Sequence, residues 1–210
     1  MLLNKPFLFI ALCLGVMDCA AQQVKPKASD FTVVNRQLTI TDNGTVQVNG
    51  VDNAGFVWLN NREFIYGTIE FDVKGNDKLQ GSFVGVAYHG LNDSTYESIY
   101  FRPFNLKADD AVRRSHSVQY IAPPQYDWPV LREKYPNKYE LAVTPAPDPN
   151  DWFHAKIDVT ADKVSVYVNH SKTPALVVTP LTHTGGTKIA YWVGFGSPGD
   201  WKNLKITDKK

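Results

Sequence analysis

The chain has 210 residues, of which 22 are basic and 21 acidic, and its formal net charge is +1 at neutral pH. This balance excludes the strong basic field that nucleic acid or anionic lipid would favour. Both cysteines, Cys13 and Cys19, lie near the amino terminus. If that segment is removed, the mature chain has no disulfide, no thiol nucleophile and no cysteine zinc site.

The amino terminus has the layout of a secretory signal peptide. Lys5 supplies a positive start, and residues 7–17 are almost wholly apolar before the chain turns polar. The apolar run is too short to span a bilayer, so we expect residues 1–21 to be removed on export to the periplasm or the exterior. A lipoprotein acylated at Cys19 is the alternative, although Asp18 before it is neither small nor apolar. No later segment reaches the roughly 18 apolar residues of a membrane helix.

Strand signals dominate the rest of the chain. We expect residues 22–30, which are polar, to form a flexible linker and residues 31–207 to form a single domain. Residues 67–74 alternate cleanly between apolar and polar side chains, as a half-buried strand does. Comparable short runs recur along the chain at 37–41, 45–51, 55–59, 81–89, 96–104, 114–121, 152–160, 163–168, 174–179, 188–196 and 201–206. This pattern, without a helical segment of ordinary length, predicts an all-β, two-sheet antiparallel sandwich.

One long segment breaks the pattern. Residues 122–150 are rich in proline and tyrosine and show little periodicity, apart from one expected helical turn around residues 131–135. A loop of this length in a small domain is usually functional or disordered. Its tryptophan and tyrosine content argues against disorder, so we interpret it as a loop that covers a site.

Several short motifs resemble one family. They are Gly67–Val73, Ser82–Tyr88, the pair Tyr96-Glu97, Asp151-Trp152 with the Val-x-Val-x-Val-Asn that follows, and the closing Lys188–Ala190 and Asp200–Ile206. Together they resemble the concanavalin A-like lectin/glucanase jelly rolls, in particular the bacterial domains of the 3-keto-disaccharide hydrolase or 3-keto-glucoside lyase type. The resemblance implies a jelly-roll sandwich and a carbohydrate ligand. Hydrolases, lyases and non-catalytic binders share this fold, which therefore does not decide between them.

The segment 96–102 carries the first candidate site residues. Alternation places Tyr100 and Arg102 on one face of the strand and Glu97 on the other, with Ile99 and Phe101. Tyrosine and arginine on an exposed concave face could stack on a sugar ring and bind its hydroxyls. The family resemblance implies an acid or base role for Glu97, which would have to curl toward the rim of the cleft. The alternative is a rim carboxylate in a surface ion pair.

A second group of candidates centres on His116. His116 and Tyr120 share a face of the expected strand 114–121, which is followed directly by the aromatic loop. His116 is a candidate base, Tyr120 a candidate ligand-binding residue, and His89, at the end of another strand, a further one. A histidine on a strand more commonly has a structural role.

Two tryptophans complete the candidate set. Trp128, followed by Arg132, could form an aromatic platform in a lid, because a sugar presents an apolar face to the ring and polar edges to the guanidinium. The alternative is a tryptophan that only anchors the loop. Trp192 faces the cleft if Tyr191 and Val193 face the core, and otherwise it belongs to the core.

The catalytic motifs of several enzyme classes are absent. Glu70-Phe-Asp72-Val-Lys74 has lysine where laminarinase-type jelly rolls need a second glutamate, which argues against a retaining two-carboxylate mechanism. We therefore expect a carbohydrate-active protein that cleaves a glycosidic bond, such as that of a 3-keto sugar, with Glu97 or His116 as base and Arg102 or a divalent cation such as calcium polarising the carbonyl. The alternatives are a non-catalytic, lectin-like glycan-binding module and a structural adhesion domain.

Overall fold

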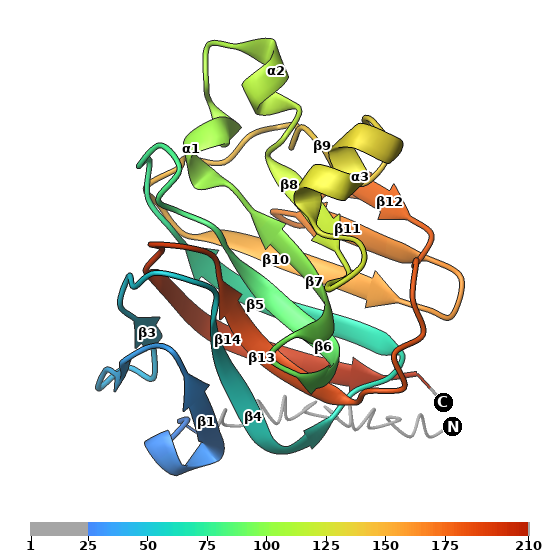
Figure 1. Ribbon diagram of the computed structural model, residues 1–210. Helices are drawn as coiled ribbons and strands as arrows, with labels where there is room; N and C mark the ends of the chain where they lie inside the picture. Colours follow the sequence, from blue (N-terminus) through green and yellow to red (C-terminus); the bar gives the residue numbers. More distant parts are fainter. Residues whose placement is uncertain (1–24, 210) are drawn as a thin grey trace, which may run out of the picture.

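Two seven-stranded antiparallel sheets pack face to face in the computed structural model, which describes residues 25–209 (Figure 1). Sheet A has the order β1 (Phe31–Val34), β4 (Gly55–Glu63), β13 (Lys188–Val193), β6 (Val84–Asn92), β7 (Thr95–Phe101), β8 (Val118–Ile121) and β9 (Glu140–Leu141). Sheet B has the order β12 (Leu176–Val178), β11 (Val164–Val168), β10 (Phe153–Val159), β5 (Gly67–Lys74), β14 (Gly199–Asp208), β3 (Val46–Val48) and β2 (Leu38–Ile40). The predicted all-β jelly-roll sandwich is confirmed.

The core lies between the two sheets and follows the alternation seen in the sequence. Ile69, Phe71 and Val73 of β5 are completely buried, whereas the residues between them are partly exposed. Aromatic contacts join the layers: the ring centroids of Phe101 (sheet A) and Phe153 (sheet B) are 5.0 Å apart. Burial of these apolar side chains is the main stabilising contribution, because it removes their surface from water.

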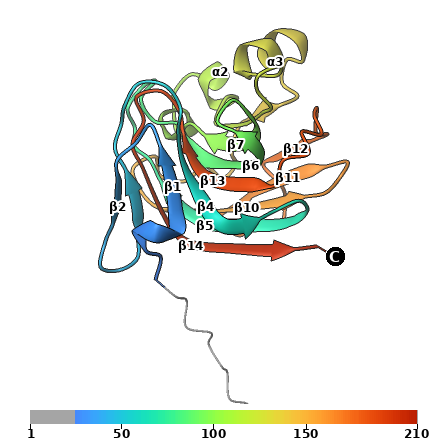
Figure 2. The same cartoon turned by 60° about the horizontal axis from the view of Figure 1, so that its bottom comes forward.

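Short helices cover the outer face of sheet A. They are α1 (Pro103–Leu106), α2 (Ala111–Arg114) and α3 (Trp128–Lys134). The 3-10 turn η1 (Ala28–Asp30) lies elsewhere, against β4 and β2. Figure 2 shows α2 and α3 on one side of the layer that contains β13, β6 and β7, with β10, β5 and β14 on its other side. Sheet A thus has an inner face against sheet B and an outer face below the helices.

Several expected strands are shorter than predicted, and two of these differences bear on the site. The strand expected over 96–104 ends at Phe101, and the one expected over 114–121 begins at Val118. Pro103 has no N–H for a ladder and starts α1, where its fixed φ suits a first helical position. Asp110 caps α2 by accepting a hydrogen bond of 2.7 Å from the Val112 amide. Strand β1 was not predicted.

The segment 122–150 has more regular structure than the sequence indicates. Instead of a single turn around 131–135 it contains the seven-residue helix α3, which begins at Trp128. The Asp127 carboxylate accepts a hydrogen bond of 2.7 Å from the Trp128 amide, and Leu131 is buried. After α3 the segment returns to sheet A and adds β9 to its edge, next to β8. Both ends of α3 are therefore anchored to sheet A.

The expected signal peptide, residues 1–21, and the alternative acylation at Cys19 lie outside the described residues. Within the expected linker, residues 25–27 have no regular structure and residues 28–30 form η1, and its flexibility stays a prediction. In the part of the chain that the structure describes, no helix has the length and apolar character needed to cross a membrane.

Candidate functional site

Aromatic side chains pack against one another on the outer face of sheet A. The ring centroids of Tyr100 (β7) and Trp192 (β13) are 4.9 Å apart, and those of Phe56 (β4) and Tyr96 (β7) are 5.1 Å apart. The Trp192 indole N–H donates a 3.2 Å hydrogen bond to the Tyr96 hydroxyl. These rings are almost fully covered, since Tyr100 is 2% and Trp192 5% exposed. They form a rigid floor and offer few free faces.

Two adjoining cavities lie above this floor, and together we call them the groove. They have volumes of about 210 Å³ and about 570 Å³ and share Phe83, Trp128 and Phe195 as lining residues. The smaller cavity, which we call the aromatic half, is lined among others by Tyr96, Tyr100, Ile121, Asp127 and Trp192. The larger, which we call the cationic half, is lined among others by Arg102, Asn105, Arg113, His116 and Arg132. Hence the two halves differ in charge.

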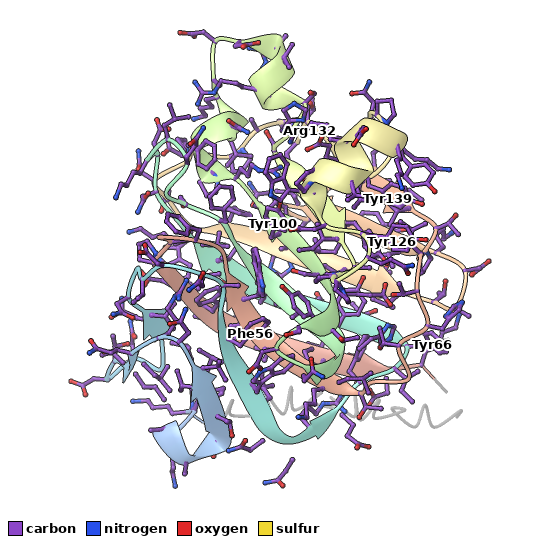
Figure 3. The ribbon with its side chains drawn as sticks, viewed as in Figure 1. Phe56, Tyr66, Tyr100, Tyr126, Arg132 and Tyr139 are labelled. Atoms are coloured by element: carbon purple, nitrogen blue, oxygen red, sulfur yellow. The ribbon has the colours of Figure 1, made fainter. Side chains whose placement is uncertain are left out.

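The rim of the groove presents apolar rings to solvent. Trp128 is 43% exposed and Phe195 60% exposed, and both line the two halves. The guanidinium carbon of Arg132 lies 4.9 Å from the centroid of the Trp128 ring, one helical turn further along α3. This cation–π contact holds the indole in place without covering both of its faces. Figure 3 shows the labelled Arg132, on α3, close to the labelled Tyr100 of sheet A.

Arg102 is the centre of a buried polar network at the floor of the cationic half. It is 5% exposed and directly follows β7. Its Nη2 group donates to the Tyr100 hydroxyl at 2.7 Å and to Gln119 Oε1 at 2.6 Å, and its Nη1 group donates to the His116 carbonyl at 2.9 Å. Burial raises the pKa of Tyr100 to about 12, so its hydroxyl is protonated at neutral pH. The network therefore fixes the Arg102 charge in one orientation.

The counter-charge is Glu140, on β9, which the sequence analysis did not select. Arg132 donates to both of its carboxylate oxygens at 2.7 Å, and Arg102 Nη1 lies 3.4 Å from Oε2. Burial alone would raise the pKa of Glu140, but the hydrogen bonds from Arg132 and the positive charges of Arg102 and Arg132 lower it below the ordinary value. Glu140 is therefore an ionised structural anion, and a proton donor at this position would need the opposite shift.

His116 lies in the turn between α2 and β8, not on a strand as predicted, because α2 extends to Arg114 and β8 starts only at Val118. Its Nδ1 atom is 3.0 Å from Glu140 Oε1 but lacks the alignment of a hydrogen bond. Burial lowers the pKa of His116, and the charges of Arg132 and Arg102 lower it further against the opposing effect of Glu140. His116 is thus a neutral imidazole at neutral pH, the form that accepts a proton.

A separate polar cluster occupies the inner face of sheet A, and we call it the internal cluster. It consists of Glu97, His89 and Tyr120. The Glu97 carboxylate is completely buried, lies 2.8 Å from His89 Nδ1 and accepts a 2.7 Å hydrogen bond from the Tyr120 hydroxyl. Glu97 therefore does not reach the cleft rim as expected, because the alternation of β7 places it with Ile99 and Phe101 toward sheet B.

Both ring nitrogens of His89 face acceptors. Nδ1 is opposite the Glu97 carboxylate, and Nε2 lies 2.6 Å from the Ile65 carbonyl oxygen. A neutral imidazole has only one N–H, so only the imidazolium can donate to both. Burial disfavours that charge, but the hydrogen bonds to Glu97 and Ile65 and the charge of Glu97 outweigh it and raise the pKa of His89 above 6.5. The geometry of the internal cluster therefore favours a protonated His89 beside Glu97.

The structure divides the predicted site residues between these two places. Six of them line the groove: Arg102, His116, Tyr100, Trp128, Arg132 and Trp192. The other three, Glu97, His89 and Tyr120, form the internal cluster on the opposite face of the sheet. The roles of all nine residues in binding or catalysis stay predictions. The sequence analysis did not identify Glu140, because it lies in a two-residue strand that is too short to show a periodic pattern.

A divalent cation such as calcium was the alternative to Arg102 for polarising the carbonyl. Within 25–209, no group of three or more histidine, cysteine, aspartate or glutamate side chains is arranged to hold a metal ion.

No family model matches the sequence, and no curated protein resembles it at a significant level. Solved structures do resemble its fold. The carbohydrate-binding module CBM66 from Bacillus subtilis aligns with a TM-score of 0.60 and 14% identity, over 85% of this chain and 96% of that chain. The exoplasmic/lumenal domain of VIP36, in a form bound to Ca²⁺ and Man3GlcNAc, aligns with a TM-score of 0.60 and 11% identity, over 89% and 87% of the two chains.

A protein from Parabacteroides distasonis with an unproven assignment as a glycosyl hydrolase aligns with a TM-score of 0.56 and 13% identity, over 87% of this chain and 89% of that chain. At these identities the similarity establishes a shared lectin-like sandwich fold and does not transfer an activity.

Glu140→Gln should destabilise the protein, because it leaves Arg102 buried without its anionic partner. We expect the free energy of unfolding, measured by urea denaturation, to fall by about 3 kcal/mol, as when one partner of a buried pair is removed. Glu133→Gln, at an exposed position of α3, is the matched control and should change it by no more than about 0.5 kcal/mol. Equal effects of the two substitutions would contradict the assigned role of Glu140.

His89 should make stability depend on pH. Its pKa is raised in the folded state, so the folded protein binds the proton more tightly, and the stabilisation is complete below pH 6.5 and is lost as pH rises through the folded-state pKa. The free energy of unfolding of His89→Gln should therefore fall further below that of the wild type at about pH 6 than at about pH 8. The same substitution at the exposed His183 is the control. A difference independent of pH would refute the buried imidazolium.

Proposed function

We propose that this protein is an exported glycan-binding protein that holds a saccharide in the groove on the outer face of sheet A. The carrying observation is the combination of an exposed, fixed Trp128 with the guanidinium and amide groups that line the cationic half. Sugars are recognised by this mixture, because their C–H faces stack on aromatic rings and their hydroxyls need directed polar partners. Trp128 is the stacking platform, and Arg132 orients it.

The absence of a free carboxylate in the cationic half favours binding over hydrolysis. Glu140 is held by Arg132 and Arg102, and Glu97 faces the interior. A two-carboxylate glycosidase needs one protonated and one ionised carboxyl on either side of the bond that it cleaves. The shared fold supports the proposal as well, since similar structures include a carbohydrate-binding module and a domain solved with a mannose-containing saccharide.

His116 supports a second candidate function, the elimination of a glycosidic bond in a 3-keto sugar. Its imidazole is neutral and lies beside Glu140, an arrangement that suits a general base. The base would remove the proton on C2, next to the carbonyl. The C1=C2 bond would form as the C1–O bond breaks, and the leaving oxygen would take up a proton. The Arg102 charge would stabilise the developing enolate oxygen.

Trp128→Ala should abolish most of the saccharide affinity. On a glycan array followed by titration calorimetry, we expect the Kd to rise at least about tenfold, because an aromatic anchor is lost. Trp152→Ala is the matched control, since Trp152 lies on the sheet B side, where Lys202 Nζ is 4.3 Å from its ring centroid. If the wild-type protein binds no glycan, or if both variants bind equally well, the groove is not a saccharide site.

His116→Gln tests the second function. If the protein releases the aglycone from 3-keto-glucosides, this variant should slow the release by about 10²-fold, the usual contribution of a general base. Glu97→Gln is the comparison, because the sequence also nominates Glu97 as base, and its melting temperature must be measured in parallel. A wild-type protein that forms no product excludes elimination and leaves the binding proposal intact.

A further inference from the structure

We propose that the saccharide bound in the groove is anionic, and that its carboxylate or sulfate group lies in the cationic half with Arg113 as its main ligand. This inference rests on the proposed function and specifies its ligand class. It is carried by the distribution of charge along the groove, an observation that the binding proposal uses only in part.

The cationic half has an excess of positive charge. Its lining contains three guanidinium groups, of Arg102, Arg113 and Arg132, together with His116, and it contains no aspartate or glutamate. Glu140, buried behind this lining, neutralises only one of the three charges. In a concave site with low-dielectric walls, uncompensated charge produces a strong local field that favours an anionic ligand.

Of the three guanidinium groups that line the cationic half, only that of Arg113 has no counter-ion among residues 25–209. Its Nη2 group donates to the Phe104 carbonyl at 2.7 Å and its Nε group donates to Asn105 Oδ1 at 3.3 Å. Both acceptors are neutral, and within residues 25–209 no carboxylate lies within ion-pair distance of Arg113. The two hydrogen bonds fix the orientation of the side chain without using up its charge. A fixed, planar guanidinium is well suited to bind carboxylate or sulfate oxygens in pairs.

The aromatic half has the opposite character. It contains one carboxylate, Asp127, and no arginine, lysine or histidine among its lining residues. Asp127 caps α3 and would repel a second anionic group placed there. An oligosaccharide across Trp128 would therefore place an anionic residue in the cationic half and an uncharged residue in the aromatic half. The charge pattern thus predicts the orientation of the ligand as well as its class.

The test compares charged and uncharged forms of the same glycans. The first pair is a tetragalacturonate and its fully methyl-esterified form, and the second is a sulfated galactan oligosaccharide and its desulfated form. Calorimetric titration of the full-length protein gives the Kd of each. We expect at least one charged form to bind about tenfold more tightly than its uncharged partner, the effect of one charge-assisted hydrogen-bond pair. The pair that shows this difference identifies the anion as carboxylate or sulfate.

Arg113→Gln locates the charge. It should weaken binding of the charged form about tenfold, leave binding of the uncharged form within about twofold, and thereby remove the preference. Arg113→Lys should retain part of the preference, since the charge remains but the planar fork is lost. Arg62→Gln, in an exposed ion pair with Asp208 on β14, is the matched control and should behave like the wild type.

The outcomes separate the two proposals. Equal affinity for charged and uncharged forms overturns the anionic ligand and leaves glycan binding in place. A preference for the charged form that remains in Arg113→Gln also overturns it, because a group other than Arg113 would then bind the anion. If neither form of either pair binds, and a broad array of neutral glycans is also negative, the proposed function fails and this inference fails with it.

Discussion

The ion pair between Glu140 and its two arginines is the interaction on which the groove depends. Glu140 is 2% exposed, and a carboxylate so deeply buried is tolerated only when charged partners and hydrogen bonds replace water. Those partners come from separate parts of the chain: Arg132 from α3 and Arg102 from the end of β7. Glu140 therefore attaches the long segment 122–150 to sheet A. This attachment helps to position Trp128 and Arg132, which line the groove from α3.

A second constraint is the alternation of side chains along β7. Successive residues point to opposite faces, so Tyr100 contributes to the groove floor while Glu97 is buried in the internal cluster. The sheet thus separates two polar groups that lie close together in sequence. The internal cluster connects β6, β7 and β8 through His89, Glu97 and Tyr120, and Tyr120 also accepts a hydrogen bond from the Leu181 amide. These contacts link neighbouring strands on the inner face of sheet A.

Three features of the groove are the reason for proposing binding ahead of cleavage. Its aromatic floor is rigid and covered, its exposed rings lie at the rim, and its polar groups are mostly cationic. A preformed site of this kind lowers the entropy cost of binding, because few side chains must be ordered when the ligand arrives. The polarity between the two halves adds direction, since the Asp127 end and the Arg113 end would not accept the same sugar residue. The shared fold alone would not indicate which ligand the groove accepts, because proteins of one fold can have different sites.

The sequence by itself determined the fold class and much of the face assignment. Alternation in residues 67–74 identified a strand with one buried face, and the same rule placed Trp192 opposite Tyr191, whose ring packs against Trp201 of the other sheet at 5.1 Å. Local rules of this kind suffice because they depend only on neighbouring residues.

The tertiary structure alone decided which groups meet. Arg102 and Glu140 are 38 positions apart, and the bond between them depends on the path of α3 and on a two-residue strand without a periodic signal. The same holds for Arg113, whose freedom from a counter-ion is a property of its surroundings. Contacts between distant residues are set by the packing of the whole chain, so the charge balance of the groove could be read only from the folded molecule.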